Sequence, residues 1–323
     1  MARKTRLRRL FRIRASVCRS STSWTWLKLR PLGTIALSAA IVSSPAVAQI
    51  NIAPTSAQCP HGAPVYEQDN RVREGGAWHV TRHVSAYRLT GSDAAFYESG
   101  LAIDADGAPN AYHPDGTSGL DSLSAAGYPR SCSVLVCVGK TPGGANIYAR
   151  THGGPFDGFF VSMSTLMDER KKPDGSPLHP KTDYRRYVDS TTVPYVAIAQ
   201  RAMKPFNLDR GLHPGRSPGE VAYVVNLRNG RGSAAAFADV GTNNTLGEGS
   251  IALAKALGLT ENQQSPRHGG VALGILTIVF PNSKTQVPWP RTPEDLTAAA
   301  EQKFKDWGGL ERVKACFPTA SLS

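Results

Sequence analysis

The sequence predicts an α+β fold in which strands dominate, and three observations lead to this prediction. Several short segments alternate between polar and apolar residues or are apolar throughout, as strands do. With 31 glycines and 23 prolines among 323 residues, turns are frequent, although less so than in disordered or collagen-like chains. Only two segments carry clear helix signals. No run of about eighteen apolar residues occurs, so a transmembrane helix is not expected.

The first 48 residues have the features of a secretory signal peptide. They contain ten of the 37 Lys and Arg residues and no acidic residue. A short apolar run from Leu32 to Val42 follows the basic region, and an A-x-A pattern ends at Ala48. We therefore expect cleavage after Ala48 and a secreted or periplasmic protein. The Arg8-Arg9 pair leaves both general and twin-arginine export open.

Loss of this leader changes the meaning of the net charge of +12. Residues 49–323 carry 27 basic and 25 acidic residues, a net charge near +2. Nucleic-acid binding then lacks the electrostatic support that a basic domain provides. We expect no nucleic-acid partner, no membrane association after cleavage, and a monomer.

The expected elements follow one another along residues 76–323, which we interpret as a single domain after an irregular, polar arm at residues 49–75. Residues 77–89 alternate between polar and apolar side chains, with His79, Thr81, His83 and Ser85 on a polar face opposite Val80 and Val84. This pattern is typical of a strand with one solvent-exposed face. Further strand candidates are 134–138, 146–150, 159–163 and 193–199.

The last third of the chain contains a hairpin, a buried strand and both helices. Strands at 221–227 and 233–240 flank Asn229-Gly230, a pair favoured in type I′ turns. Residues 270–280 are apolar throughout, which indicates a buried strand. Ser250 is a suitable cap for a helix that ends at Gly258, and Thr292-Pro293-Glu294-Asp295 has the residue order of a second helix start.

Cysteine usage agrees with export. The four cysteines after the leader are Cys59, Cys132, Cys137 and Cys316, an even number that suggests two disulfides. Cys132 and Cys137 lie at an odd spacing on a strand candidate, hence on opposite faces, so we do not expect them to pair with each other. Cys59 would then join the N-terminal segment to this strand, and Cys316 the C-terminal tail. No C-x-x-C pair suggests zinc.

The segment 237–259 contains the best catalytic candidates. Asp239 ends the second hairpin strand, a Gly- and Asn-rich loop follows, and Glu248 stands just before the helix that Ser250 caps. Two carboxylates brought together across such a loop could flank a glycosidic bond, where one protonates the leaving oxygen and the other activates water. On spacing alone, the simpler interpretation is that Asp239 caps a turn and Glu248 is a solvated acid.

Three segments resemble glycoside hydrolase family 75, the chitosanases. FADVGTNNTLGEGS (237–250) is similar to the family's strand, Asp, loop and Gly-Glu-(Ala/Gly)-Ser helix start. AIDADG (102–107) resembles its Asp-Ile-Asp-Cys-Asp-Gly segment, and DSTTVPYVAI (189–198) resembles its segment ending in Val-Pro-(Phe/Tyr)-(Val/Ile). The resemblance implies inverting hydrolysis of the β-1,4 bonds of chitosan by Asp239 and Glu248, without metal or other cofactor. Ala105 replaces a Cys of the fungal members, which implies a different disulfide pattern.

The resemblance also favours Glu248 as acid and Asp239 as base. A helix start beside Glu248 would favour its ionised form, so the assignment of the two roles stays open. Protonated chitosan is a polycation, and we expect further carboxylates to line the cleft, namely Asp104, Asp106 and Asp115, with Tyr112 stacking on a sugar. A plain turn is the alternative for this segment, whereas the calcium-loop spacing is incomplete.

The same strand, Asp-Gly, loop and helix pattern is similar to double-psi β-barrel proteins of cell-wall biology. This similarity implies a six-stranded double-psi-like β-barrel core with a few peripheral helices and long loops. It also leaves two alternative functions, a peptidoglycan-acting glycosidase or lytic transglycosylase and a non-catalytic barrel that binds cell-wall glycans.

Overall fold

The computed structural model describes residues 54, 59–74, 77–126, 147–150, 153–208, 218–284 and 289–322. All of them belong to one compact unit, Ile50–Ser323. In these ranges no helix combines the length and the apolar character that a membrane crossing requires.

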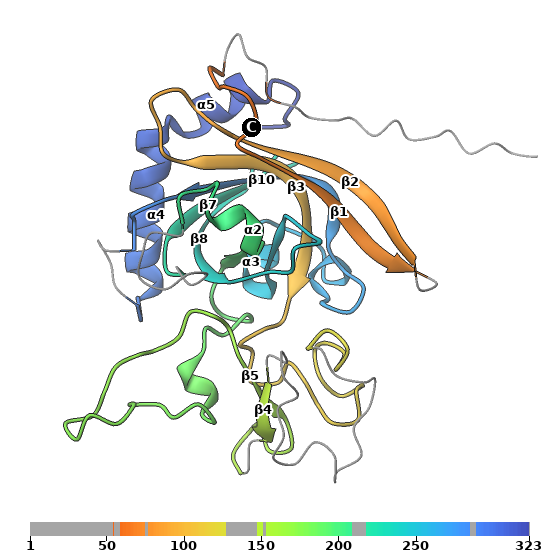
Figure 1. Cartoon of the computed structure of the whole chain (residues 1–323), viewed down its shortest axis with the longest axis vertical. Coiled ribbons are helices and arrows are strands. Elements are labelled where there is room, and N and C mark those ends of the chain that lie inside the picture. The colour runs from red at the N-terminus through yellow and green to blue at the C-terminus, as the bar shows by residue number, and fades with distance from the viewer. Residues whose placement is uncertain are drawn as a thin grey trace, which may run out of the picture. The chain divides into compact units, whose positions relative to one another are not determined.

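The fold is a mixed, β-rich α+β barrel, as predicted (Figure 1). Strands join in the order β1-β2-β3-β10-β7-β8-β6-β9, and pairing of β9 with β3 closes a ring of six. Pairs β3–β9 and β6–β8 are parallel, and the other pairs are antiparallel. The strands of this sheet are β1 Tyr66–Glu74, β2 Ala77–Arg88, β3 Ala95–Asp104, β6 Tyr195–Ala197, β7 Val221–Asn226, β8 Gly232–Asp239, β9 Glu248–Ser250 and β10 Val271–Phe280.

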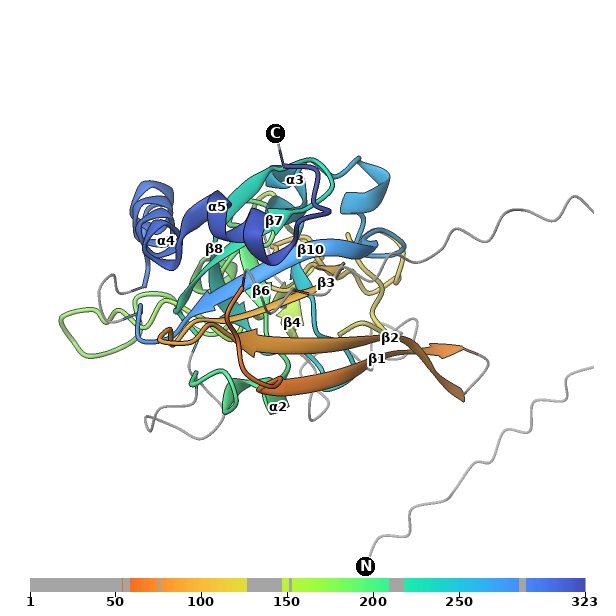
Figure 2. The same cartoon turned by 90° about the horizontal axis from the view of Figure 1, so that it is seen from above.

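The remaining described elements surround this barrel. A two-stranded sheet is formed by β4 (Ile147–Arg150) and β5 (Phe160–Ser162). The α-helices are α2 Gln200–Met203, α3 Ile251–Ala256, α4 Pro293–Trp307 and α5 Gly309–Cys316, and short 3-10 turns lie at Tyr184–Arg186 and Asn262–Gln264. Helix α4 packs against β7 and β8, and α5 follows it on the same side (Figure 2).

Both faces of the central strands are buried, which explains their continuous apolar sequence. On β10, Ile275 and Val279 contact a core that includes residues of α2 and α3, whereas Leu276 and Ile278 contact a second core that includes residues of α4 and α5. A strand covered on both sides loses the polar alternation of a half-exposed one. The expected buried strand at 270–280 is therefore confirmed.

The predicted hairpin and both helix starts are also confirmed. Strands β7 and β8 pair antiparallel around Asn229-Gly230. Ser250 caps α3 by accepting the N–H of Leu253, and Thr292 caps α4 by accepting the N–H of Asp295. Candidates 77–89, 146–150, 159–163 and 193–199 contain β2, β4, β5 and β6, whereas 134–138 lies outside the described residues.

The irregular arm was a wrong prediction for residues 66–74, which form β1. Among the described strands it pairs with β2 alone, at the edge of the sheet, so its sequence lacks the apolar face of a covered strand. The same position explains Val80, which is 57% exposed although it was expected on the apolar face. Only Ala86–Arg88 of β2 pair with β3, and the outer part of the hairpin extends beyond the barrel (Figure 1).

A disulfide joins Cys59 to Cys316, at the end of α5. The expected link between Cys59 and the segment at 132–137 is therefore wrong, and Cys132 and Cys137 lie outside the described residues. Both bonded cysteines are buried in the core beneath α4 and α5. Strand periodicity carries no information on this pairing, because helix packing brings the two ends of the domain together.

We expect loss of this disulfide to destabilise the domain strongly. The bond spans 257 residues of sequence. A closed loop of this length lowers the conformational entropy of the unfolded chain, which stabilises the folded state by roughly 5 kcal/mol. The double variant Cys59→Ala, Cys316→Ala should lose about 3–5 kcal/mol of unfolding free energy in urea denaturation. Each single variant should lose nearly as much, because either one breaks the same bond. Variants whose urea unfolding midpoint equals that of the wild type would contradict the prediction.

Candidate active site

Three strand ends bring the candidate carboxylates together. Asp104 ends β3, Asp239 ends β8, and Glu248 begins β9. Asp239 and Glu248 are both register partners of Ala197, on either side of β6. Their Cα atoms are therefore separated by two strand spacings, roughly 10 Å.

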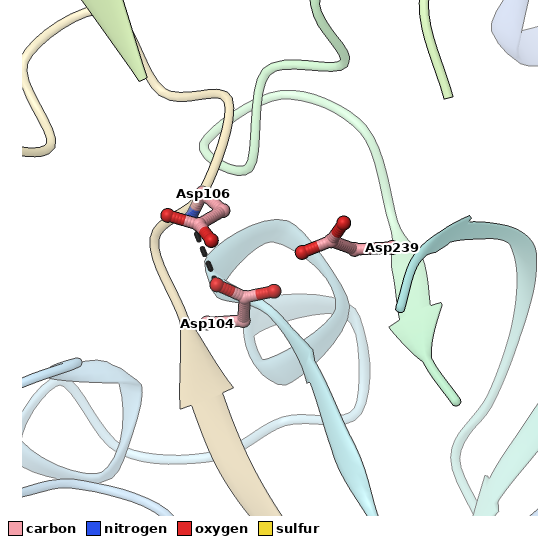
Figure 3. A group of neighbouring side chains, drawn as sticks. All are labelled: Asp104, Asp106 and Asp239. Carbon is pink, nitrogen blue, oxygen red and sulfur yellow. Dashed lines mark hydrogen bonds between the residues drawn. The ribbon is translucent and has the colours of Figure 1, made fainter. Parts of the chain in front are cut away.

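Asp104, Asp106 and Asp239 form a compact group of buried carboxyls (Figure 3). One oxygen from each residue lies within 4.8 Å of the others. In Figure 3 the Asp239 carboxyl points from β8 towards Asp104, and Oδ1 of Asp104 accepts the backbone N–H of Asp106 at 2.8 Å. The structure thus joins the AIDADG and FADVG motifs at a single site.

The loop after β3 holds Asp106 in this group through a small core of its own. Tyr112 donates its hydroxyl to Oδ1 of Asp106 at 2.7 Å, and Ser162 of β5 donates to the same oxygen at 3.3 Å. The Tyr112 ring is 2% exposed and packs with Phe160 and the alanines of the loop. Tyr112 is therefore not placed to stack on a sugar, and the sequence-based expectation is wrong, because the ring orients Asp106 instead.

Asp115, the third acid expected to line the cleft, is not part of the group. Its Oδ1 accepts the N–H groups of Thr117 and Ser118, both at 2.8 Å, and its Oδ2 accepts the Ser118 hydroxyl. These bonds hold the pKa of Asp115 well below its usual range. The arrangement is the plain turn considered as the alternative for this residue.

Asp239 and Glu248 have contrasting surroundings. Oδ1 of Asp239 accepts the backbone N–H of Thr165 at 2.8 Å and its hydroxyl at 2.5 Å. In contrast, Oε2 of Glu248 is buried and has no hydrogen-bond partner among the described residues. A Cβ on Gly241 would lie 2.7 Å from this oxygen, so the glycine leaves the space that Glu248 occupies.

Burial raises the pKa of the carboxyl groups of Asp104, Asp239 and Glu248. Burial, with a smaller contribution from the Asp239 charge, raises the pKa of Asp104 to about 7. Burial and the charges of Asp104, Asp239 and Asp121 raise the pKa of Glu248 well above its usual value. Burial also raises the pKa of Asp239, but the hydrogen bonds from Thr165 and Val240 oppose this shift.

No basic side chain neutralises these three acids within the part of the chain that the structure describes. None of the salt bridges there involves Asp104, Asp239 or Glu248. Their mutual repulsion can be relieved by protonation or by a cation. The oxygens of Asp104, Asp106 and Asp239 are of the kind that Ca²⁺ and Mg²⁺ prefer, although the sequence offers only an incomplete calcium-loop spacing at Asp104 and Asp106.

Three further residues of this site were missed from the sequence. Thr165 lies in a loop outside the three motifs, and Gly241 lies within the 237–250 motif, but the sequence gives no sign that this glycine leaves space for Glu248. Asp121 is buried beside Ser122, whose N–H it accepts, and its charge raises the pKa of both Asp104 and Glu248. An isolated Asp in a Ser-rich loop gives no signal of such a place.

Comparison with known proteins adds no family assignment. The chain matches no protein-family model and has no significant match among curated proteins. The similarity to family 75 therefore depends on its three motifs, and the geometry must carry any proposal of function.

We expect the unfolding free energy to fall as pH rises from about 4 to about 7. Asp104 has an ordinary pKa when unfolded and one near 7 when folded, so the folded state binds the additional proton in this range. The stabilising contribution is complete below pH 4 and is lost as pH passes 7, and it amounts to about 4 kcal/mol at most. Asp104→Asn, which can still accept the N–H of Asp106, should flatten this dependence in urea titrations at pH 4–8. An equally steep slope in the variant would contradict the assignment.

Proposed function

We propose that this protein is an inverting glycosidase that hydrolyses the β-1,4 bonds of chitosan, with Glu248 as general acid and Asp239 as general base. The observation that carries the proposal is the pairing of both residues with Ala197, on opposite sides of β6. Two strand spacings between the Cα atoms leave room for the wide carboxyl separation of inverting enzymes, in which a water fits between the base and the sugar.

The unequal environments of the two carboxyls support these roles. A general acid must keep its proton near neutral pH, and the burial of the Glu248 carboxyl and the absence of a donor to its Oε2 among the described residues favour its neutral form. A general base must be ionised, and the two donors of Thr165 favour ionised Asp239. The helix-dipole objection to Glu248 is weak, because α3 has six residues and Ser250 already accepts one of its first N–H groups.

The surplus of acids supports an amine-bearing substrate. Asp104, Asp106, Asp121, Asp239 and Glu248 contribute to one largely buried group of acids, and among the described residues no salt bridge neutralises Asp104, Asp239 or Glu248. A protonated glucosamine unit would supply the missing positive charge, whereas the acetylated sugars of chitin and peptidoglycan carry no such charge. This difference favours chitosan over the cell-wall alternatives.

Export is part of the same proposal. The leader pattern at residues 1–48 and the disulfide between Cys59 and Cys316 both suit a protein that acts outside the cytoplasm, where polymeric chitosan is accessible.

The test is hydrolysis by the purified protein of soluble chitosan, glycol chitin and cell-wall sacculi. We expect glucosamine oligomers from chitosan, and a loss of about 10²–10⁴-fold in kcat for Asp239→Asn and for Glu248→Gln. Glu301→Gln, on the exposed side of α4, is the matched control and should retain full activity. Muropeptide release would instead identify a peptidoglycan enzyme, and binding without products a wall-binding barrel.

Stereochemistry tests the mechanism separately. NMR of the first products should show the α-anomer, because a water activated by Asp239 attacks the face opposite the leaving group. Initial β-anomer would exclude this mechanism even if both carboxylates prove essential.

A further inference from the structure

We propose that Thr165 is a positioning residue for the general base, and that its two donors to one oxygen of Asp239 decide which of the two carboxyls serves as base. The inference rests on the proposed function and deepens it. Thr165 lies in the loop between β5 and the 3-10 turn at Tyr184–Arg186 and belongs to none of the three motifs.

The hydrogen-bond geometry commits Thr165 to Asp239. The backbone N–H and the hydroxyl donate to the same atom, Oδ1, at 2.8 and 2.5 Å. The Thr165 oxygen also accepts the N–H of Val240 at 3.3 Å, so the single hydroxyl hydrogen remains for Asp239. Oδ2 receives no donor from Thr165.

The backbone around Thr165 is fixed by β8 itself. The N–H of Leu166 donates to the carbonyl of Ala238 at 2.8 Å, one residue before Asp239. Ser164 donates its hydroxyl to the carbonyl of Leu166 and accepts the N–H of Val188, both at 2.8 Å. Thr165 and Asp239 are thus held on adjacent backbone segments, which fixes the two donors relative to the Asp239 carboxyl.

The other ionisable groups around Asp239 do not favour its charge. Asp104 at the end of β3, Asp106 in the following loop and Glu248 of β9 are acids, and Tyr195 of β6 is a neutral phenol. Among the described residues, the N–H and O–H groups of Thr165 and the N–H of Val240 are the donors that lower the pKa of Asp239. No described residue donates a comparable hydrogen bond to Oε2 of Glu248. The donors of Thr165 are therefore the main difference between the surroundings of the two carboxyls.

The experiment compares Thr165→Val with Thr165→Ser in chitosan hydrolysis across pH. Valine keeps the shape and the backbone N–H but removes the hydroxyl, whereas serine retains the hydroxyl. In the Val variant we expect the acidic limb of kcat/KM to move upward by about one pH unit, because the base loses a donor to its ionised form. We expect kcat to fall about 10-fold with little change in KM, and Ser to restore both the limb and kcat to within about 3-fold of wild type.

A readout without substrate separates this inference from the proposed function. In protein labelled with ¹³C at the Asp carboxyls, the resonance that disappears in Asp239→Asn reports the titration of this residue. Its midpoint should rise in Thr165→Val and return in Thr165→Ser, whether or not chitosan is the substrate. If no substrate is cleaved but the midpoint moves, the function fails and the positioning role stands.

Two results would overturn the inference. One is an unchanged Asp239 midpoint and an unchanged acidic limb in Thr165→Val, and the other is a Ser variant that behaves like Val. Thr165→Ala replaces the Val variant if the latter does not fold, as judged by its urea transition. Thr260→Val, at an exposed loop position, is the control and should match wild type in every measurement.

Discussion

The structure depends on a three-residue strand, β9, that closes the barrel between β3 and β6. The chain passes so close to its neighbours that two glycines are required there. A Cβ on Gly247, whose φ is +99°, would lie 2.2 Å from the Ser99 hydroxyl, and one on Gly249 would lie 2.8 Å from the carbonyl of Tyr195. Glu248, between these glycines, is therefore the first side chain of the closing strand, and β6 lies between it and Asp239.

Barrel closure also explains why the acids are buried together. The parallel pairs β3–β9 and β6–β8 bring Asp104, Asp239 and Glu248 to one region, and the small core around Tyr112 adds Asp106. Such a group disfavours folding at neutral pH, since like charges repel and burial removes their hydration. The two apolar cores and the disulfide offset this cost, a balance typical of functional sites that are not optimised for stability.

Local features of the fold could be predicted from the sequence, whereas long-range ones could not. Local features depend on a few neighbouring residues and therefore show as sequence patterns. Examples are the helix caps at Ser250 and Thr292, the Asn229-Gly230 turn and the apolar run of β10. Edge strand β1, the short β9 and the Cys59–Cys316 bond depend on partners far along the chain. At the site, Asp104, Asp106, Asp239 and Glu248 came from motif similarity, but the buried ring of Tyr112 and the donors of Thr165 became visible only in three dimensions.

The contrast between Asp239 and Glu248 shows why residue type alone cannot assign their roles. Both are carboxylic acids, Asp239 is buried and Glu248 is partly buried, and each lies within the field of Asp104. Because charges so close together cannot all be present at once, the group ionises where hydrogen-bond donors are available. Thr165 provides such donors at Oδ1 of Asp239, whereas Oε2 of Glu248 faces the space beside Gly241 without one. Thr165, a loop residue outside the three motifs, thus favours ionisation of Asp239 over that of Glu248.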